Sequence, residues 1–358
     1  MPAAGSPPLF EIHPPLLNSA CPWATTLDDL RRLYQCPSTG AVTTRTSLIK
    51  GFDHDPAKHQ FFFFDAARGG AGDPSASSPT LNASINSLGY SPLTLHEYIN
   101  FLKTISDELP PSEPARKGFI VSVTGSPDDV AKSYRLLAAA APSLRFPLAM
   151  EINLSCPNIP GRPPPAYDQH ALETYLTPLR RAVIDVHVLP DHTPIPVGLK
   201  TPPYTYTTQF LALVDALESA TKASLESNEG EGGGCPISFV TATNTLGNCL
   251  LYASSSDSDS SAGVLAPALP SNGLGGMAGP PLHPLALGNV ATLRRLLDER
   301  EKVLGTRVAI IGVGGVSDAE GYRRMRAAGA DAVALATGLG LKGVEVFGEV
   351  ERGLGGRW

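Results

Sequence analysis

The segment LAMEINLSCPN, residues 148–158, decides the fold. It begins with a mostly apolar run and ends in a cysteine, Cys156, flanked by Asn153 and Asn158. A strand that is apolar along its length, rather than at alternate positions, is typical of a parallel sheet covered by helices on both faces. The segment therefore predicts a buried parallel strand whose end carries chemically useful side chains.

Seven further apolar runs of this kind occur, at residues 16–20, 40–47, 118–125, 196–200, 238–244, 308–315 and 332–338. Helix-like stretches lie between most of them, at 27–34, 127–139, 170–188, 206–220, 287–301 and 318–328. Eight buried strands alternating with helices predict an α/β fold, a closed (β/α)8 TIM barrel that forms one domain over residues 1–358. A doubly wound open sheet is the alternative. In the barrel, working residues lie where strands end and loops begin.

Three segments predict insertions at the barrel mouth. Residues 226–234 and 254–263 are rich in glycine, serine and acidic residues, a composition that predicts flexible surface loops. Residues 51–80 form a connection longer than an ordinary loop between strand and helix, and they include the run Phe61 to Phe64. We expect this long inserted loop to form a lid, a hairpin or a partner contact.

Composition excludes several classes of protein. The net charge is −6, which disfavours binding to nucleic acid or to an anionic membrane surface. The chain begins without a signal-peptide pattern and has no apolar stretch of membrane-spanning length, so we expect a cytoplasmic protein with no membrane partner. The five scattered cysteines form no CxxC pair, which predicts reduced thiols and no metal site.

The cysteine at the end of residues 148–158 indicates catalysis. A thiol just past a barrel strand points into the mouth, where it can act as a base or nucleophile. Asparagine amides beside it can hold a planar ligand through both donors and acceptors. Alone, Cys156 would be read as a small packing residue, but its two asparagine neighbours favour a site.

The same segment resembles the active-site motif of class 1 dihydroorotate dehydrogenases, and Pro163 with Ala166, Tyr167 and Asp168 resembles the fumarate-reducing class 1A. Further matches occur in the same order at residues 84–89, 197–204, 244–248, 273–279 and 310–316. Together they extend over roughly residues 16–340. The fold of that family agrees with the barrel predicted from the strand pattern.

The resemblance implies an FMN-dependent oxidation of dihydroorotate to orotate in pyrimidine biosynthesis. Cys156 takes the role of the base that removes a proton from carbon 5, while hydride leaves carbon 6 for the flavin. Lys200 takes the role of the cation that stabilises negative charge on the reduced flavin. The substrate-binding positions are Arg45, Asn86, Leu88, Gly89, Asn153, Asn158, Asn244 and Thr245.

The cofactor-binding positions that the resemblance implies are Ala20, Thr44, Lys200, Thr243, Gly275, Gly276, Gly314, Gly315, Thr337 and Gly338. Gly314-Gly315 and Thr337-Gly338 follow the seventh and eighth predicted strands, where barrels commonly hold a phosphate. Backbone N–H groups in glycine-rich turns can approach a phosphate closely. Gly275-Gly276 resembles a third glycine contact in an earlier loop.

The sequence departs from the family pattern at five places, one of which, Leu88 for a usual methionine, preserves side-chain volume. Arg45 stands where the family usually has a lysine close to both flavin and substrate, and an arginine is longer, planar and permanently charged. Asn18 to Cys21 differs from the usual Asn-Ala-Ser-Gly, residues 48–64 lack the usual Arg-Glu-Gly-Asn-Pro run, and Thr337-Gly338 reverses a usual order. Arg45 can hold a carboxylate or indicate a changed substrate.

The resemblance also implies partners. Fumarate is the favoured electron acceptor, because the chain has neither the N-terminal membrane segment of the quinone-linked class nor a cysteine cluster for iron and sulfur. A homodimer is expected. The alternatives are a diverged flavin oxidoreductase acting on another dihydropyrimidine or an enone, a catalytically silent flavin-binding barrel, and a sugar-phosphate aldolase or isomerase with a Schiff-base lysine.

Overall fold

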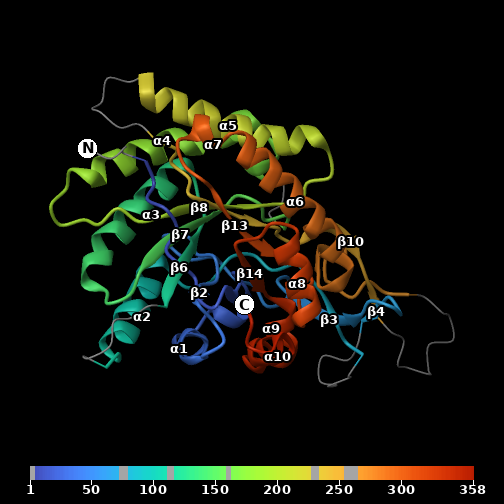
Figure 1. Ribbon diagram of the computed structural model, residues 1–358. Coiled ribbons are helices and arrows are strands. Elements are labelled where there is room, and N and C mark those ends of the chain that lie inside the picture. Colours follow the sequence, from blue (N-terminus) through green and yellow to red (C-terminus); the bar gives the residue numbers. More distant parts are fainter. Residues whose placement is uncertain (1–4, 72–79, 111–116, 159–162, 227–233, 254–264) are drawn as a thin grey trace.

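A closed barrel of eight parallel strands forms the centre of the computed structural model (Figure 1). The strands are β1 (Leu16–Asn18), β2 (Ala41–Thr43), β6 (Gly118–Val123), β7 (Leu148–Asn153), β8 (Val197–Thr201), β9 (Phe239–Ala242), β13 (Ala309–Val313) and β14 (Ala332–Leu335). They neighbour one another in chain order, and β14 pairs with β1 to close the ring. All eight predicted strands are confirmed, and the open doubly wound sheet is excluded. The structure describes residues 5–71, 80–110, 117–158, 163–226, 234–253 and 265–358.

Helices surround the barrel (Figure 1). Those predicted are α1 (Leu27–Gln35), α3 (Pro127–Ala140), α4 (Gln169–His187), α5 (Thr207–Glu226), α6 (His283–Glu299) and α8 (Ala319–Ala327). Those not predicted are α2 (Leu95–Asp107), α7 (Glu301–Leu304), α9 (Thr337–Lys342) and α10 (Glu345–Leu354). Helix α2 had a readable start signal, because the Thr94 side chain and Glu97 form a capping box. Single 3-10 turns are η1 (Pro22–Ala24), η2 (Ala141–Ser143), η3 (Pro165–Tyr167) and η4 (Pro280–Leu282). None of the described helices is long and apolar enough to cross a membrane.

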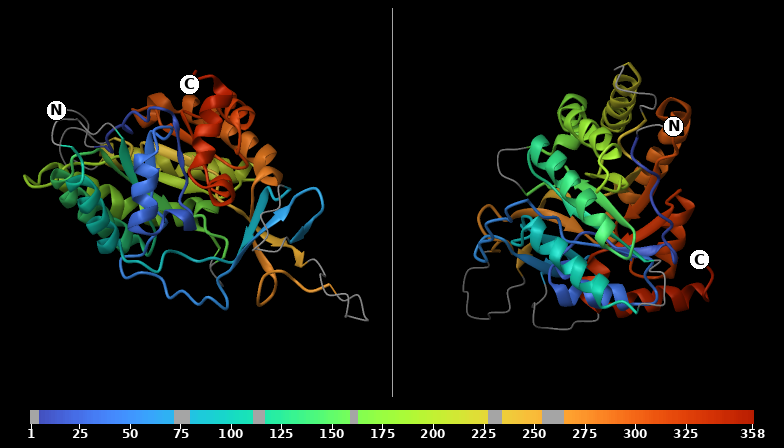
Figure 2. Two further views of the ribbon diagram at one scale, coloured as in Figure 1. Left: turned by 90° about the horizontal axis from the view of Figure 1, so that it is seen from below. Right: turned by 90° about the vertical axis from the view of Figure 1, so that its left-hand side faces the viewer.

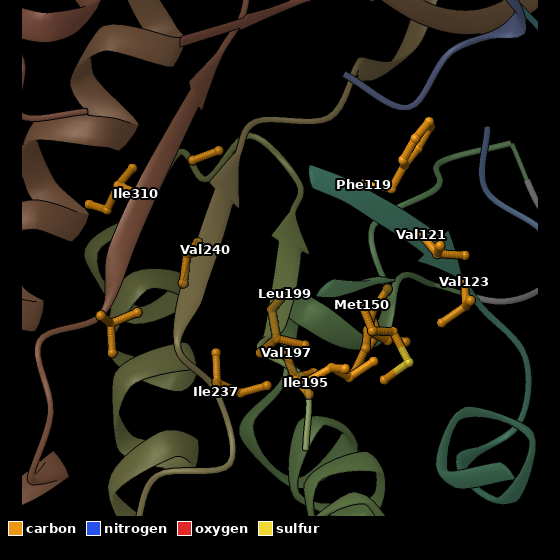
Figure 3. Packing of buried hydrophobic residues seen from close by; sticks show 14 of the residues in the cluster. Phe119, Val121, Val123, Met150, Ile195, Val197, Leu199, Ile237, Val240 and Ile310 are labelled. Carbon is orange, nitrogen blue, oxygen red and sulfur yellow. The ribbon is translucent and has the colours of Figure 1, made fainter. Parts of the chain in front are cut away.

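Side chains of the barrel strands alternate between two apolar cores. Figure 3 shows the outward-facing set, which includes Phe119, Val121 and Val240 and packs under the helices. The inward-facing set fills the barrel and contains small residues such as Ala149 beside Phe239. Gly198 on β8 makes room for that ring, since a Cβ there would lie 2.2 Å from it.

The N-terminal segment closes one end of the barrel. Leu9, Phe10 and Ile12 pack against the inward-facing core. A Cβ on Gly118, the first residue of β6, would lie 2.5 Å from the Phe10 ring. Because that end is filled, the carboxyl ends of the strands form the accessible mouth.

A second sheet projects from one side of the barrel (Figure 1 and Figure 2). It has six strands in the order β10 (Leu246–Leu250), β12 (Leu274–Ala278), β5 (Ala83–Asn86), β3 (Phe61–Asp65), β4 (Gly70–Ala71) and β11 (Tyr252–Ala253). Phe64, Ile85 and Leu269 belong to its own small core. The sequence did not predict this sheet.

The predicted insertions have different outcomes. Within residues 51–80, β3 and β4 form an antiparallel hairpin, which was one of the three expected forms, so the segment is not only a loop. Residues 72–79 and 254–263 lie outside the described residues. Of the predicted insertion 226–234, the structure describes only Glu226, which ends α5, and Gly234. The single domain over 1–358 stays a prediction.

Candidate active site at the carboxyl end of the barrel

Two adjoining hollows open where the barrel strands end. The larger, which we call the mouth hollow, has a volume of about 770 Å³ and lies between the barrel and the second sheet. The smaller, the glycine-turn hollow, has a volume of about 520 Å³ and lies over the ends of β13 and β14. They share lining residues, among them Lys200 and Asn244, so one extended ligand can occupy both.

Most of the predicted site residues line these hollows. Those in the mouth hollow are Ala20, Arg45, Asn86, Leu88, Gly89, Asn153, Cys156, Asn158, Lys200, Asn244, Thr245 and Thr337. Those in the glycine-turn hollow include Thr243, Gly314, Gly315 and Gly338. Sequence positions nearly 200 residues apart, such as Arg45 and Asn244, are therefore brought to one place. Their individual roles stay predictions.

Three of the predicted cofactor residues do not line either hollow. Thr44 is buried, and its hydroxyl accepts a hydrogen bond from the Ser122 backbone N–H at 3.1 Å. Gly275 and Gly276 lie in β12 of the second sheet, and not in a loop as predicted. They allow close approach, since a Cβ on Gly275 would lie 2.5 Å from the Asn86 carbonyl oxygen. A packing requirement accounts for these two glycines.

Asparagine amides in the mouth hollow hold one another in place. Asn244 donates through Nδ2 to Asn153 Oδ1 at 3.2 Å and to Ser155 Oγ at 3.0 Å. Asn158 donates through Nδ2 to Asn86 Oδ1 at 3.0 Å and to the Leu88 carbonyl at 2.9 Å. Because these bonds restrict the rotamers of the amides, a ligand would meet pre-arranged donors and acceptors.

Cys156 lies just beyond β7 and lines the mouth hollow, as Cys21 also does. Burial raises the pKa of the Cys156 thiol, whereas the Asn158 backbone N–H, the Lys200 charge and the Tyr90 hydroxyl oppose the rise. The three opposing groups all stabilise a thiolate. Burial also raises the pKa of Tyr90, so its hydroxyl stays protonated and can donate.

Two cations face the mouth hollow. Lys200, at the end of β8, is 4% exposed and donates to Ser19 Oγ at 3.0 Å. Arg45 donates through Nη2 to the Gly89 carbonyl at 3.3 Å, and burial lowers its pKa. Among the described residues, no carboxylate forms an ion pair with either, and none lines the mouth hollow. Burying unpaired cations is costly, so the hollow is suited to an anionic ligand.

Aromatic rings form another wall of the mouth hollow. Trp23 and Phe61 both line it, with ring centroids 5.6 Å apart and nearly perpendicular planes. Phe63 stacks on Trp23 with a centroid distance of 5.6 Å. Such rings pack well against a flat conjugated ligand.

The glycine-turn hollow carries features of a phosphate site. Gly314 and Gly315 adopt φ values of +138° and +71°, which disfavour any residue with a Cβ. A Cβ on Gly315 would also lie 2.8 Å from the Gly279 carbonyl oxygen. The neighbouring Thr243 hydroxyl is buried and has no hydrogen-bond partner among the described residues. An unsatisfied buried hydroxyl beside a glycine turn indicates a polar ligand.

The structure also corrects one detail of this hollow. The sequence predicted a glycine-rich turn at Thr337-Gly338, and these residues instead begin helix α9. The Thr337 hydroxyl lies 2.9 Å from the Ser84 hydroxyl of the second sheet. The wall of the hollow at this point is therefore a helix start tied to β5.

Comparison with known proteins places the chain in a family. The family model described as dihydroorotate dehydrogenase matches residues 65–357. The chain belongs to the dihydroorotate dehydrogenase family. A putative dihydroorotate dehydrogenase A (fumarate) from Streptococcus uberis is 26% identical over 332 residues, which cover 93% of this chain and 85% of the relative. A dihydroorotate dehydrogenase (fumarate) from Trypanosoma cruzi is 27% identical over 338 residues, which cover 94% and 87%.

A solved structure supports the fold. The DHODH from Eimeria tenella, crystallised in complex with ferulenol, has a TM-score of 0.64 and 17% identity to this chain. The match covers 96% of this chain and 81% of the solved one. The (β/α)8 barrel therefore holds for this dihydroorotate dehydrogenase family member.

The sequence analysis missed several residues of this family member's site. Tyr90, Trp23 and Phe61 all line the mouth hollow. Tyr90 directly follows the matched segment 84–89, and this adjacency was a usable signal. The two other aromatic residues lie far apart in the chain, and only the second sheet brings Phe61 to Trp23.

Proposed function

We propose that this protein oxidises dihydroorotate to orotate, with FMN as its cofactor and fumarate as its electron acceptor, in pyrimidine biosynthesis. One observation carries the proposal: the Cys156 thiol, the Lys200 ammonium and four asparagine amides line a single hollow. The fumarate assignment rests on the names of the relatives. A homodimer and a cytoplasmic location belong to the same proposal and rest on the resemblance to class 1A.

The residues of both hollows fit FMN. Gly314, Gly315 and the unsatisfied Thr243 hydroxyl would hold its phosphate and adjoining hydroxyls. Lys200, which lines both hollows, would lie against its ring, and Trp23 offers a flat apolar wall. When bound, FMN supplies the acceptor for the hydride that leaves carbon 6 of the substrate.

Cys156 performs the proton step. Its thiolate takes the proton from carbon 5 of dihydroorotate, so the C–H bond breaks and an S–H bond forms. Lys200 lowers the energy of the thiolate through its charge, and the Tyr90 hydroxyl does so by donating a hydrogen bond. The asparagine amides fix the ring of the substrate through paired donors and acceptors.

Arg45 binds the carboxylate of the substrate in this proposal. It is a cation in the mouth hollow without an acidic partner among the described residues, and a guanidinium can bind a carboxylate through two parallel hydrogen bonds. The same residue supports a second candidate function, because the family usually has a lysine here. In that alternative the enzyme is a diverged flavin oxidoreductase that accepts another anionic dihydropyrimidine.

The first test is the cofactor. We expect the purified protein to be yellow and to release about one FMN per chain on heating, because both hollows fit a single extended ligand. Chromatography of the released flavin identifies it. Anaerobic dihydroorotate should then bleach the flavin spectrum. Recovery of FAD, or no flavin binding after reconstitution, would overturn the cofactor assignment, and bleaching only by another dihydropyrimidine would favour the diverged enzyme.

The second test is pH. Because burial raises the pKa of Cys156 and only the thiolate accepts a proton, the rate of flavin reduction should rise with pH through the alkaline range. Tyr90→Phe removes a hydroxyl that lowers the pKa of Cys156. The pH profile of flavin reduction by this variant should therefore move to higher pH. Loss of one hydrogen bond predicts a rate about fivefold lower at neutral pH and a recovery at high pH.

Tyr175→Phe is the matched control for Tyr90→Phe. The Tyr175 hydroxyl lies in a neighbouring hollow that Tyr90 also lines, but it donates to the Gly125 carbonyl at 3.0 Å. Its profile should follow that of the wild type. Equal profiles for wild type and Tyr90→Phe would remove the tyrosine from the proton step.

A further inference from the structure

His283 bridges two elements behind the glycine-turn hollow. It is the first residue of α6 and is 8% exposed. Its Nδ1 lies 2.7 Å from the carbonyl oxygen of Gly314, the first glycine of the turn after β13. Its Nε2 lies 3.1 Å from Nε of Arg324 on α8, a helix that packs beside α6 (Figure 1).

Arg324 determines the tautomer of this histidine. An arginine Nε–H can only donate a hydrogen bond, so Nε2 of His283 must accept and carries no proton. A neutral imidazole then carries its proton on Nδ1, which donates to the Gly314 carbonyl. The directions of both hydrogen bonds therefore follow from the guanidinium.

The hydrogen bond to Gly314 fixes a peptide plane. In a trans peptide the carbonyl of one residue and the N–H of the next point in opposite directions. Holding the Gly314 oxygen toward His283 therefore directs the Gly315 N–H away from it. This restraint matters because both glycines adopt positive φ, a region in which glycine has several accessible conformations. Without His283 the peptide between them could rotate.

We infer that His283, held in one tautomer by Arg324, is a positioning residue that orients the Gly315 N–H toward the phosphate group of FMN. This inference rests on the proposed function and extends it to residues outside the lining of both hollows. The pair adds no contact to the flavin ring. Its effect on binding therefore depends on the phosphate. Replacing His283 should not change the affinity for riboflavin, which has the flavin ring and no phosphate.

Binding of FMN and of riboflavin to the deflavinated full-length protein tests the inference. Quenching of flavin fluorescence gives both dissociation constants. His283→Leu should weaken FMN binding about tenfold, the loss expected for one buried hydrogen bond, and leave riboflavin binding unchanged. His283→Asn should retain FMN binding, because its amide N–H can replace Nδ1–H. His283→Gln, whose amide reaches toward Arg324 instead, should behave like His283→Leu.

Arg324→Met completes the set. This variant keeps the imidazole but lets either ring nitrogen of His283 carry the proton. FMN binding should therefore weaken by less than in His283→Leu. His187→Asn, at an exposed histidine on α4, is the control and should bind both flavins like wild type. A thermal unfolding transition close to that of wild type reports that each variant is folded.

Two outcomes would overturn the inference. One is FMN binding by His283→Leu within twofold of wild type, and the other is an equal loss of riboflavin binding. A wild-type protein that binds neither flavin would overturn the proposed function as well. Failure of the two proposals is thereby distinguishable.

Discussion

Cys156→Ala is expected to oxidise dihydroorotate about 10²–10⁴-fold more slowly than wild type, the usual cost of removing a positioned general base. The variant should still bind FMN and orotate, because the asparagine amides hold one another and not the thiol. Anaerobic mixing with dihydroorotate measures the rate of flavin bleaching. A shift of the flavin spectrum on adding orotate measures binding.

Cys156→Ser and Cys249→Ala provide the comparison. The serine variant should also be slow near neutral pH, because a hydroxyl accepts a proton far less readily than a thiolate does. Cys249 lies in β10, outside the lining of both hollows, and its alanine variant should react like wild type. If Cys156→Ala bleaches as fast as wild type and still binds orotate, another residue is the base. If even the wild type shows no shift with orotate, Arg45 and a different substrate become the explanation.

The barrel was predictable because each of its strands is a continuous apolar run. Residues 148–155 and 308–315 bury both faces, one against helices and one inside the barrel, so the periodicity of a half-exposed strand is absent. Strand ends were placed within a few residues, as with the predicted run 238–244 against Phe239–Ala242. Chain order then determined strand order, since every crossover joins neighbours.

The second sheet was not predictable in the same way. Its strands are short, and partners such as β5 and β12 are separated by about half the chain. Gly275 and Gly276 reduce the strand signal of β12, and they were read as a phosphate loop. The run Phe61 to Phe64 was noticed, but its pairing with β5 depends on contacts that a local pattern does not contain.

The site residues also differ in how far the sequence could predict them. Lys200 and Asn153 lie at the ends of barrel strands, and Cys156, Asn158 and Asn244 follow such ends closely, so fold and motif together placed them in one mouth. Asn86 ends β5 of the second sheet and was placed by the motif alone. Tyr90 and Trp23 lie in loops, whose course the sequence does not determine. His283 was counted as part of a connecting segment, because the predicted helix 287–301 began four residues after the true start of α6. Its role depends on a bond to α8 that only the packed structure contains.

Lys200→Met should lower the rate of flavin reduction by dihydroorotate about 10²–10³-fold, the loss typical of removing one preorganised group that stabilises developing charge. Methionine keeps the length and apolar stem of lysine and removes the ammonium. Lys200 is 4% exposed and its ammonium donates to the neutral Ser19 hydroxyl, so its charge acts on the hollow with little screening. Stopped-flow bleaching under anaerobic conditions measures the rate.

Lys117→Met separates the effect of this charge from the cost of removing a hydrogen-bonded lysine ammonium, although Lys117 is only half-buried. Lys117 directly precedes barrel strand β6. Its ammonium donates to the Tyr34 carbonyl at 2.7 Å and to the Thr39 hydroxyl at 3.0 Å, outside both hollows. Replacing Lys117 should lower the midpoint temperature of thermal unfolding and leave flavin reduction at the wild-type rate. Lys200→Met should do the reverse if its charge serves the reaction. A Lys200→Met protein that holds FMN and is reduced as fast as wild type would show that the ammonium acts only in structure, and the charge that favours the Cys156 thiolate would then have to come from Arg45.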